Sequence, residues 1–351
     1  MTFEDVLEIK NGKNQRAVED PNGTYPIYGS GGIMGYANNF ICQANTVIIG
    51  RKGNINKPIY VEEPFWNVDT AFGLEAKKEV LLPKYLYYFC LRFDFERLNK
   101  AVTIPSLTKS DLLKIEMELP AIAIQADVID RLGKIEKIID LRKKELQRLN
   151  DLIKARFVEM FGDPSDNSGA DKVELSELCE KITDGEHGSV ARVPNGHPFL
   201  NAKHVLKTGR IDWDTITYVG DEDHQRIYKR CNPVEGDILL TTTGTIGNVA
   251  IMPKSEEVSM DRGITLLKID RKKVTSEFVA ELLKQPSIQT EMGVNIHASA
   301  IGHLFMNKVK KLPAILPQLE RQVEFTDFVK QVDKSKSRKE LNHKTEIRLV
   351  S

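Results

Sequence analysis

At 351 residues the chain is longer than one average domain, and the common range of about 100–200 residues per domain predicts two or three compact units. The apolar share of 41% and the charged share of 28% are typical of a globular protein and exclude wholesale disorder or a fibrous repeat. Because 50 basic and 50 acidic side chains cancel, any surface that binds nucleic acid must be a local patch.

Membrane, metal and disulfide signals are missing from the sequence. No run approaches about 18 consecutive apolar residues, and the amino terminus lacks a basic region followed by an apolar stretch, so we expect a cytoplasmic protein without a membrane partner. The cysteines Cys42, Cys90, Cys179 and Cys231 form no Cys-x-x-Cys pair. We therefore expect reduced, structural thiols and no metal site.

Residues 1–118 read as a first domain of mixed α and β structure, with short apolar runs broken by Gly, Asn and Pro. The run 47–50 is typical of a buried strand, and a turn at Gly53-Asn54 should follow it. Residues 82–91 have helical spacing and carry Pro83 near the start, as helices often do.

Residues 119–163 predict a long coiled-coil helix that ends at Gly162-Asp163-Pro164. Arg142 and Arg156 interrupt its apolar seam, and they would fix the register or face the flank of a short antiparallel partner. About 40 residues would give a rod of roughly 60 Å, longer than one domain needs for its own core. The apolar seam positions are Val128, Leu132, Ile135, Ile139, Leu146, Leu149, Ile153 and Met160.

The same order recurs in a second domain at 164–311 and a second long helix at 312–351. Here the strand is 238–241, the turn Gly244-Thr245 and the helix 276–284. The final helix starts at Leu316 or Gln318, keeps a seam as far as Val332, and loses it over 334–339. Two such helices can pair antiparallel and hold two globular units apart. A lone run of this kind is more often a helix packed on its own domain.

An internal repeat of about 190 residues explains this order. Segment 46–58 (TVIIGRKGNINKP) aligns with 237–249 (DILLTTTGTIGNV), and 68–74 with 260–266, which places Asp69 on Asp261. The segment LPAI occurs at 119–122 and 312–315, so that Gln125 falls on Gln318. The starting segments, 3–8 and 175–180, are only 172 residues apart, so the second copy carries an insertion of roughly 20 residues between Gly185 and Asp237.

This order of parts closely resembles the specificity subunits of type I restriction-modification systems, and the resemblance covers nearly the whole chain. It is carried by 25–36 (YPIYGSGGIMGY), 236–247 (GDILLTTTGTIG), the two LPAI segments and 153–164 (IKARFVEMFGDP). The resemblance implies an α+β protein with two target-recognition domains, two helices in an antiparallel coiled coil, and a pseudo-twofold repeat. Each domain would read one half of an asymmetric DNA target, and the helices would set the spacer between the halves.

The resemblance also implies a non-catalytic subunit bound to double-stranded DNA and to two modification (methyltransferase) subunits. Restriction subunits would join the complex, and the S-adenosylmethionine and ATP chemistry would belong to the partners, with no cofactor on this chain. The glycines of 28–35 do not follow a dinucleotide-binding spacing, because Met34 takes the place of the last glycine.

Residues that read DNA should offer positive charge, hydroxyl or amide groups, or exposed backbone amides. The cluster 51–57 (RKGNINK) satisfies this in the first domain, although a solvated hairpin turn would look the same; the matching 241–248 segment lacks the charges. In the first domain the candidate contacts are Lys13, Tyr28, Ser30, Arg51, Lys52, Asn54, Lys57 and Lys109. In the second they are His187, Lys203, His204, Thr242, Thr243, Thr245, Arg262, His297 and Ser299.

Two rival functions stay open. A lone DNA methyltransferase or nuclease is disfavoured, because the sequence has only Asn232-Pro233 and Asp163-Pro164 in place of an Asn/Asp-Pro-Pro-aromatic motif, and no nucleotide-binding loop. A coiled-coil scaffold that binds only proteins is compatible with zero net charge. Salt-dependent and sequence-dependent binding to duplex DNA would separate a specificity subunit from that scaffold.

Overall fold

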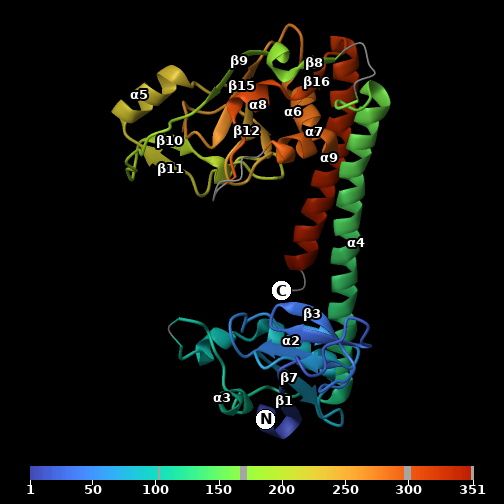
Figure 1. Ribbon diagram of the computed structural model, residues 1–351. Coiled ribbons are helices and arrows are strands. Elements are labelled where there is room, and N and C mark those ends of the chain that lie inside the picture. The colour runs from blue at the N-terminus through green and yellow to red at the C-terminus, as the bar shows by residue number, and fades with distance from the viewer. Residues whose placement is uncertain (102, 167–171, 296–301, 349–351) are drawn as a thin grey trace. The chain divides into compact units, whose positions relative to one another are not determined.

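The computed structural model describes residues 1–101, 103–166, 172–295 and 302–348, with 337–348 by backbone alone. It divides into unit 1, Met1–Arg142, and unit 2, Lys143–Ser351 (Figure 1). Each unit combines small sheets with helices, which confirms the predicted α+β class. No helix in the described ranges is both long enough and apolar enough to cross a bilayer.

Unit 1 is built on two small sheets. A four-stranded antiparallel sheet has the order β1-β7-β4-β5, and a three-stranded sheet has the order β3-β2-β6, in which β2 and β6 are parallel. The strands are β1 (Leu7–Asn11), β2 (Tyr25–Gly29), β3 (Gly32–Ala37), β4 (Thr46–Gly50), β5 (Ile59–Val61), β6 (Trp66–Asn67) and β7 (Ala71–Ala76). The helices are α1 (Phe3–Val6), α2 (Pro83–Arg92), η1 (Phe95–Leu98), α3 (Lys109–Leu113) and the first part of α4 (Ile122–Phe161).

Strand β4 is buried on both faces, as its unbroken apolar run predicts. Val47 and Ile49 belong to the cluster that includes Leu86 of α2, whereas Ile48 packs on the other side. This alternation follows from the period of two in a strand. The predicted turn is confirmed at Gly53, whose φ of 80° is readily adopted by glycine.

Unit 2 repeats the scaffold of unit 1. Its four-stranded sheet, β9-β15-β12-β13, matches β1-β7-β4-β5, and β11-β10-β14 matches β3-β2-β6, including the parallel pair. The strands are β8 (Lys172–Glu174), β9 (Cys179–Asp184), β10 (His197–Leu200), β11 (Thr217–Val219), β12 (Ile238–Thr241), β13 (Val249–Ile251), β14 (Ser259–Met260), β15 (Ile264–Ile269) and β16 (Pro313–Ile315). The helices after α4 are η2 (Leu175–Leu178), η3 (Ala202–His204), α5 (Asp221–Arg230), α6 (Ser276–Leu283), α7 (Pro286–Val294), α8 (Met306–Lys310) and α9 (Leu319–Arg348).

The matched hydrogen bonds correct two details of the sequence alignment. The Gln125 side chain donates to the Val80 and Pro120 carbonyls and accepts from the Leu82 amide. The Gln322 side chain makes the matching bonds: it donates to the Lys273 and Pro317 carbonyls and accepts from the Thr275 amide. Gln125 therefore corresponds to Gln322, not to Gln318. Segment 119–122 leads into α4, but 313–315 forms strand β16, paired with β8, so the two LPAI segments are not equivalent.

The second correction is a shift of one residue. The Ala71 amide donates to the Val68 carbonyl, and the Ile264 amide makes the matching bond to Asp261. Asp261 therefore corresponds to Val68, and the pairing of Asp69 with Asp261 was wrong.

The predicted insertion is confirmed and falls into two parts. Strand partners match Ile27 with Phe199, Tyr36 with Tyr218, and Ile48 with Leu239, so the offset grows from 172 to 182 and then to 191. The first step lengthens the β10–β11 connection, and the second contains helix α5.

Unit 2 completes its core with the C-terminal part of α4, which lies alongside α9 (Figure 1). Arg156 bonds to Glu324 at 3.1 Å and Arg321 donates to the Met160 carbonyl, an order that makes the two helices antiparallel. The Phe157 ring meets Phe278 and Phe325 at centroid distances of 5.6 and 5.4 Å. Arg156 thus faces the flank of α9, as one reading of the interrupted seam expected.

Candidate nucleic-acid interface

In unit 1 the ends of several strands meet at one edge. The Arg51 amide donates to the Thr70 carbonyl at 2.8 Å, Gly53 to Pro105 at 3.0 Å, and Lys13 to Asn67 at 2.8 Å. We call this set, residues 13, 28–34, 51–57, 68–70 and 103–106, the loop edge of unit 1. The turn of β2–β3 joins it through the Ser30 hydroxyl, which is 3.4 Å from the Lys52 carbonyl.

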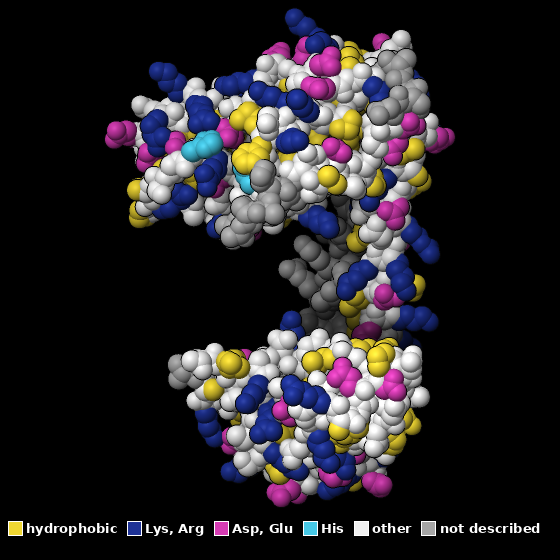
Figure 2. Space-filling model, in the orientation of Figure 1, with side chains coloured by type: hydrophobic (Ala, Val, Ile, Leu, Met, Phe, Trp, Pro, Cys, Tyr) yellow, Lys and Arg dark blue, Asp and Glu magenta, His cyan; other side chains and the backbone are white. Residues whose placement is uncertain are grey.

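Five predicted contacts are exposed on this edge: Lys13 and, in the loop after β4, Arg51, Lys52, Asn54 and Lys57. The Arg51 guanidinium carbon lies 5.7 Å from the centroid of the buried Phe72 ring, so its stem is held against the domain. Within the described parts of the chain, no carboxylate forms an ion pair with Arg51, Lys52 or Lys57. They are therefore available to phosphate, and Figure 2 shows Lys and Arg side chains next to hydrophobic ones on the visible face of this unit.

Lys13, Tyr28 and Lys109 differ in what their side chains contact. Lys13 is exposed, and its carbonyl accepts the Trp66 indole N–H at 3.0 Å. Tyr28 is half-buried against Phe65, and burial raises the pKa of its hydroxyl. The Lys109 ammonium donates to the Ile9 carbonyl at 2.8 Å. Tyr28 and Lys109 therefore stabilise the scaffold, whereas Lys13 is free to face a ligand.

Unit 2 has the equivalent edge, made by the same backbone bonds. The Thr242 amide donates to Gly263 at 2.8 Å, Gly244 to Gly302 at 3.3 Å, and Glu186 to Met260 at 2.9 Å. We call this set, residues 184–188, 201–204, 241–247, 261–263 and 302–305, the loop edge of unit 2. Four predicted side chains are exposed on it, namely His187, Lys203, Thr245 and Arg262.

Two predicted contacts of unit 2 are buried instead. His204 is fully buried; its Nδ1 accepts from the Asn201 amide at 3.0 Å and its Nε2 lies 3.2 Å from the Thr215 carbonyl. Burial is the main cause that lowers the pKa of this imidazole. Thr242 is 1% exposed and its hydroxyl lies 3.4 Å from the Gly263 carbonyl. We therefore remove both from the contact set, because neither presents a polar atom at the surface.

His303 is a candidate that the sequence did not single out. Its Nδ1 lies 2.7 Å from the Thr243 hydroxyl and its ring meets Phe305 at 4.8 Å. Burial, followed by the charge of Arg262, lowers its pKa, so the ring is neutral near pH 7. His303 occupies the place of Ser106, since both form bridges to the loop after the central strand. Aligning Gln125 with Gln322 would have found it, whereas His297 and Ser299 lie outside the described residues.

Two carboxylates on the loop edge of unit 2, Asp184 and Glu186, form ion pairs with the inserted helix. Arg230 of α5 pairs with Asp184, and His187 lies 2.7 Å from the same carboxylate. Arg226 pairs with Glu186, whose pKa is lowered by the Gly188 amide and then by this arginine. The inserted helix thus supplies cations next to the acidic side chains that follow β9. This lowers the electrostatic repulsion between the loop edge of unit 2 and a phosphate.

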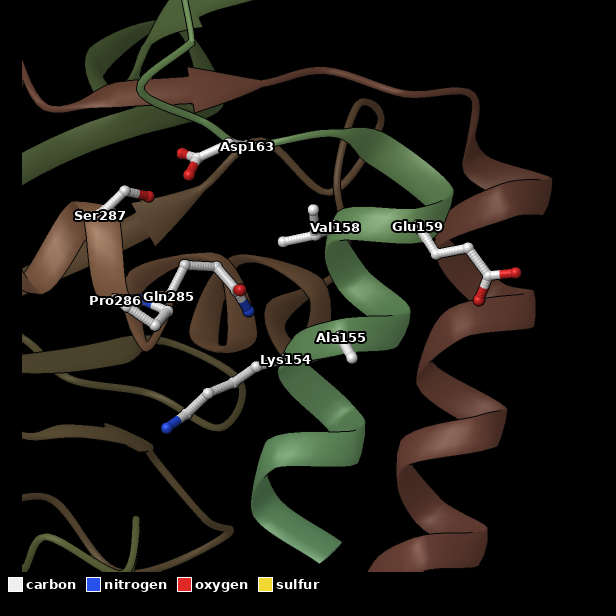
Figure 3. Close-up of a pocket in the computed structure, with 8 residues that line it drawn as sticks. All are labelled: Lys154, Ala155, Val158, Glu159, Asp163, Gln285, Pro286 and Ser287. Carbon is white, nitrogen blue, oxygen red and sulfur yellow. The ribbon is translucent and has the colours of Figure 1, made fainter. Parts of the chain in front are cut away.

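A pocket of about 530 Å³ lies elsewhere in unit 2, between α4 and the start of α7 (Figure 3). Figure 3 shows Lys154 at one end, with Asp163 and Ser287 at the other. Burial opposes the ionisation of Asp163, but hydrogen bonds from Ser287 and Ser165 lower its pKa overall. Gln285 is 1% exposed, and within the described residues its Oε1 has no hydrogen-bond partner. The pocket contains none of the predicted DNA contacts.

Neither unit shows the residues of a metal centre. No group of three or more His, Cys, Asp or Glu side chains in the described ranges is arranged to hold an ion. The four cysteines are free thiols, and burial raises the pKa of Cys42, Cys179 and Cys231 to about 12. These thiols are structural rather than reactive.

Comparison with known proteins identifies relatives over most of the chain. It is 22% identical over 325 residues to a putative type I restriction enzyme specificity subunit of Haemophilus influenzae, covering 86% of this chain and 78% of that protein. It is 21% identical over 315 residues to the EcoBI specificity subunit of Escherichia coli, covering 82% of this chain and 66% of that protein.

Solved structures share the fold. The S subunit of a type I restriction-modification system from M. genitalium matches with a TM-score of 0.52 and 16% identity, covering 99% of this chain and 92% of that one. A chain from a study of complex assembly and conformational transition in the type I system matches with a TM-score of 0.59 and 15% identity, covering 99% and 94%. A model of the type I restriction modification DNA specificity domain matches residues 1–151 and 167–348, and the chain therefore belongs to that family of DNA-recognition subunits.

Proposed function

We propose that the two units read the two halves of a bipartite, asymmetric DNA target. One observation carries this proposal: the same scaffold occurs twice, but its equivalent loops present different side chains. Unit 1 presents Arg51, Lys52 and Asn54 at positions that threonines occupy in unit 2, where Thr245 is exposed, Thr243 is half-buried and Thr242 is buried. Charged and amide groups recognise different base edges from those recognised by hydroxyl groups, so the halves of the target should differ.

We further propose that α4 and α9 set the spacer between the half-sites. Helix α4 has 40 residues and would extend roughly 60 Å, whereas half-sites one turn of B-DNA apart need a separation of about 34–36 Å. The antiparallel contact of α4 with α9 supports a stiff connection, because paired helices resist bending better than a flexible linker.

Two methyltransferase subunits are the proposed protein partners, with restriction subunits joining the complex. We assign the S-adenosylmethionine and ATP chemistry to those partners and no catalytic step to this chain. The exposed apolar side chain of Val158 lines the pocket of Figure 3, and Leu152, which is also exposed, lies on the same helix α4. Apolar groups exposed on one face of a helix favour contact with a partner protein.

A domain exchange tests the two-reader proposal. Residues 1–118 are replaced by the first domain of another specificity subunit, and the methylome is sequenced in cells that also express the methyltransferase subunit. We expect one half of the methylated target to change, while the other half and the spacer stay the same. A change in both halves would contradict the proposal.

A pair of variants tests the docking surface. Val158→Lys should reduce co-purification of the methyltransferase subunit, because it places a charge among apolar contacts. Leu206→Lys makes the same kind of change at another exposed site of unit 2, where Leu206 is 38% exposed, and serves as the control. Equal co-purification of the wild type and both variants would place the partner elsewhere.

A further inference from the structure

The tip of the β2–β3 hairpin presents large apolar side chains to solvent. Ile33 is 55% exposed and Met34 is 61% exposed, although both lie in a strand of unit 1. Exposed apolar groups on a strand at the edge of a sheet favour aggregation unless they have a partner. The tip of the hairpin therefore needs an explanation beyond folding.

Local backbone geometry holds these two side chains outward. The pairing of β2 with β3 shifts register between Ile27 and Tyr28, so that Tyr28 faces Ile33 and Met34 has no partner across the ladder. Gly32 has a φ of 121°, which closes the hairpin in a conformation that other residues rarely adopt. A side chain at Gly29 would lie 2.7 Å from the Met34 sulfur, so a larger residue there would displace the methionine side chain.

The free edge of β3 is too short to suit a second strand. Glu19 forms a bridge with Ala37, and the Asp20 amide donates to the Tyr36 carbonyl at 2.9 Å, so this chain already covers that end of the edge. Pairing with a strand of another protein would have only the segment Gly32–Gly35 available. Side-chain insertion is therefore favoured over strand addition.

The surroundings of the tip are positively charged on the side of the loop edge. The Ser30 hydroxyl is 3.4 Å from the Lys52 carbonyl, which places the turn against the segment that carries Arg51 and Lys52. Two acids are also nearby: Glu19 forms a bridge with Ala37 and its carboxylate reaches Gly35, and Asp69 is exposed on the loop edge. An apolar tip beside unpaired cations matches DNA, in which phosphates flank stacked bases.

We propose that Ile33 and Met34 form a wedge that enters a base step of the half-site read by unit 1 and partly unstacks it. This inference rests on the proposed function, because it requires that unit 1 binds DNA. The wedge would favour a flexible pyrimidine–purine step, which is the least costly to open, and so it would contribute specificity without a hydrogen bond to a base.

The test uses the full chain in complex with its methyltransferase subunit. The probe is a duplex of the methylated target with 2-aminopurine placed in turn at each step of the half-site that a domain exchange assigns to unit 1. We expect the fluorescence at one step to rise at least threefold on binding. The variant Ile33→Thr/Met34→Gln should lose most of that rise, while its thermal unfolding and its methyltransferase content stay unchanged.

Two control variants separate the wedge from other effects. Val80→Thr makes the same kind of change at another exposed position of unit 1, 37% exposed, and should keep the rise. Arg51→Ala should weaken binding and lower its salt dependence but keep the rise at saturation.

Three outcomes would overturn the wedge. They are no fluorescence rise at any step, an unchanged rise in the double variant, or loss of the methyltransferase subunit from the double variant, which would identify the tip as a protein contact. If the target is still methylated and its first half still follows residues 1–118, then only the wedge fails and the proposed function stands.

Discussion

The two units share a scaffold but differ in how their loop edges come to carry cations. In unit 1, Arg51 and Lys52 are exposed without carboxylate partners in the described ranges. In unit 2, Asp184 and Glu186 come at the end of β9 and are paired with Arg226 and Arg230 of the inserted helix α5. Under the proposed function, a duplicated scaffold would reach a surface that accepts phosphate either by loop composition or by adding an element.

The units also differ in their dependence on α4. The core of unit 2 contains Ile153, Phe157 and Met160, whereas unit 1 contacts the start of α4 through polar groups, namely the hydrogen bonds of Gln125 and the bond from the Tyr88 hydroxyl to Glu136 at 2.9 Å. We expect Phe157→Ala to destabilise unit 2 by about 3–5 kcal/mol, because the ring is fully buried among other aromatic rings. Chemical denaturation measures this loss, and the exposed neighbour changed in Val158→Ala is the control. A small loss would mean that α4 is not part of the core.

The two glutamines test the corrected repeat. Gln125→Ala and Gln322→Ala should each cost about 1–3 kcal/mol, because each leaves buried backbone groups without a partner. Gln318→Ala removes an exposed side chain and should have little effect on the free energy of unfolding. A large effect at Gln318 with none at Gln322 would restore the alignment that the sequence suggested.

The inserted helix can be tested through its charge. Arg230→Ala should weaken DNA binding by about 1 kcal/mol at low salt, because Asp184 would then repel phosphate. Lys229→Ala removes the same charge from an exposed neighbouring position and should weaken binding less. Fluorescence anisotropy over a salt series measures both, and equal losses would show that Arg230 acts only through net charge.

The smallest expected effect concerns pH. Burial lowers the pKa of His204 in the folded state, so an unfolded chain binds its proton more readily. Above the pKa that His204 has in the unfolded chain, about 6.5, its contribution to stability is fully present. That contribution is lost as the pH falls from there towards the lower pKa of His204 in the folded protein. Thermal unfolding between pH 8 and pH 5 should show a smaller acid loss in His204→Gln than in the wild type. Identical pH profiles would contradict the assignment.

Much of the fold was predictable because its signals are local. The strands 47–50 and 238–241, the turns at Gly53 and Gly244, and the helices after Leu82 and Thr275 follow from periodicity, glycine and helix-start residues close in sequence. The alignment failed where two similar segments, both reading LPAI, have different partners. The hydrogen bonds of Gln322 identified the equivalent positions correctly, whereas the identity of the four residues LPAI did not.

The site was less predictable than the fold. Exposure separated Arg51, Lys52 and Arg262 from the buried His204 and Thr242, although all four residue types suit nucleic acid. His303 was missed because its partner, Thr243, lies 60 residues earlier in the chain.

The sequence by itself determined the duplicated frame, the family and the long helices, because each can be found from local patterns or from the order and similarity of segments along the chain. Only the tertiary structure decided which side chains reach the edge, how α5 neutralises Asp184 and Glu186, and that Gln322 corresponds to Gln125. Burial and hydrogen bonding join residues that are far apart in the chain, and no local pattern records which ones will meet.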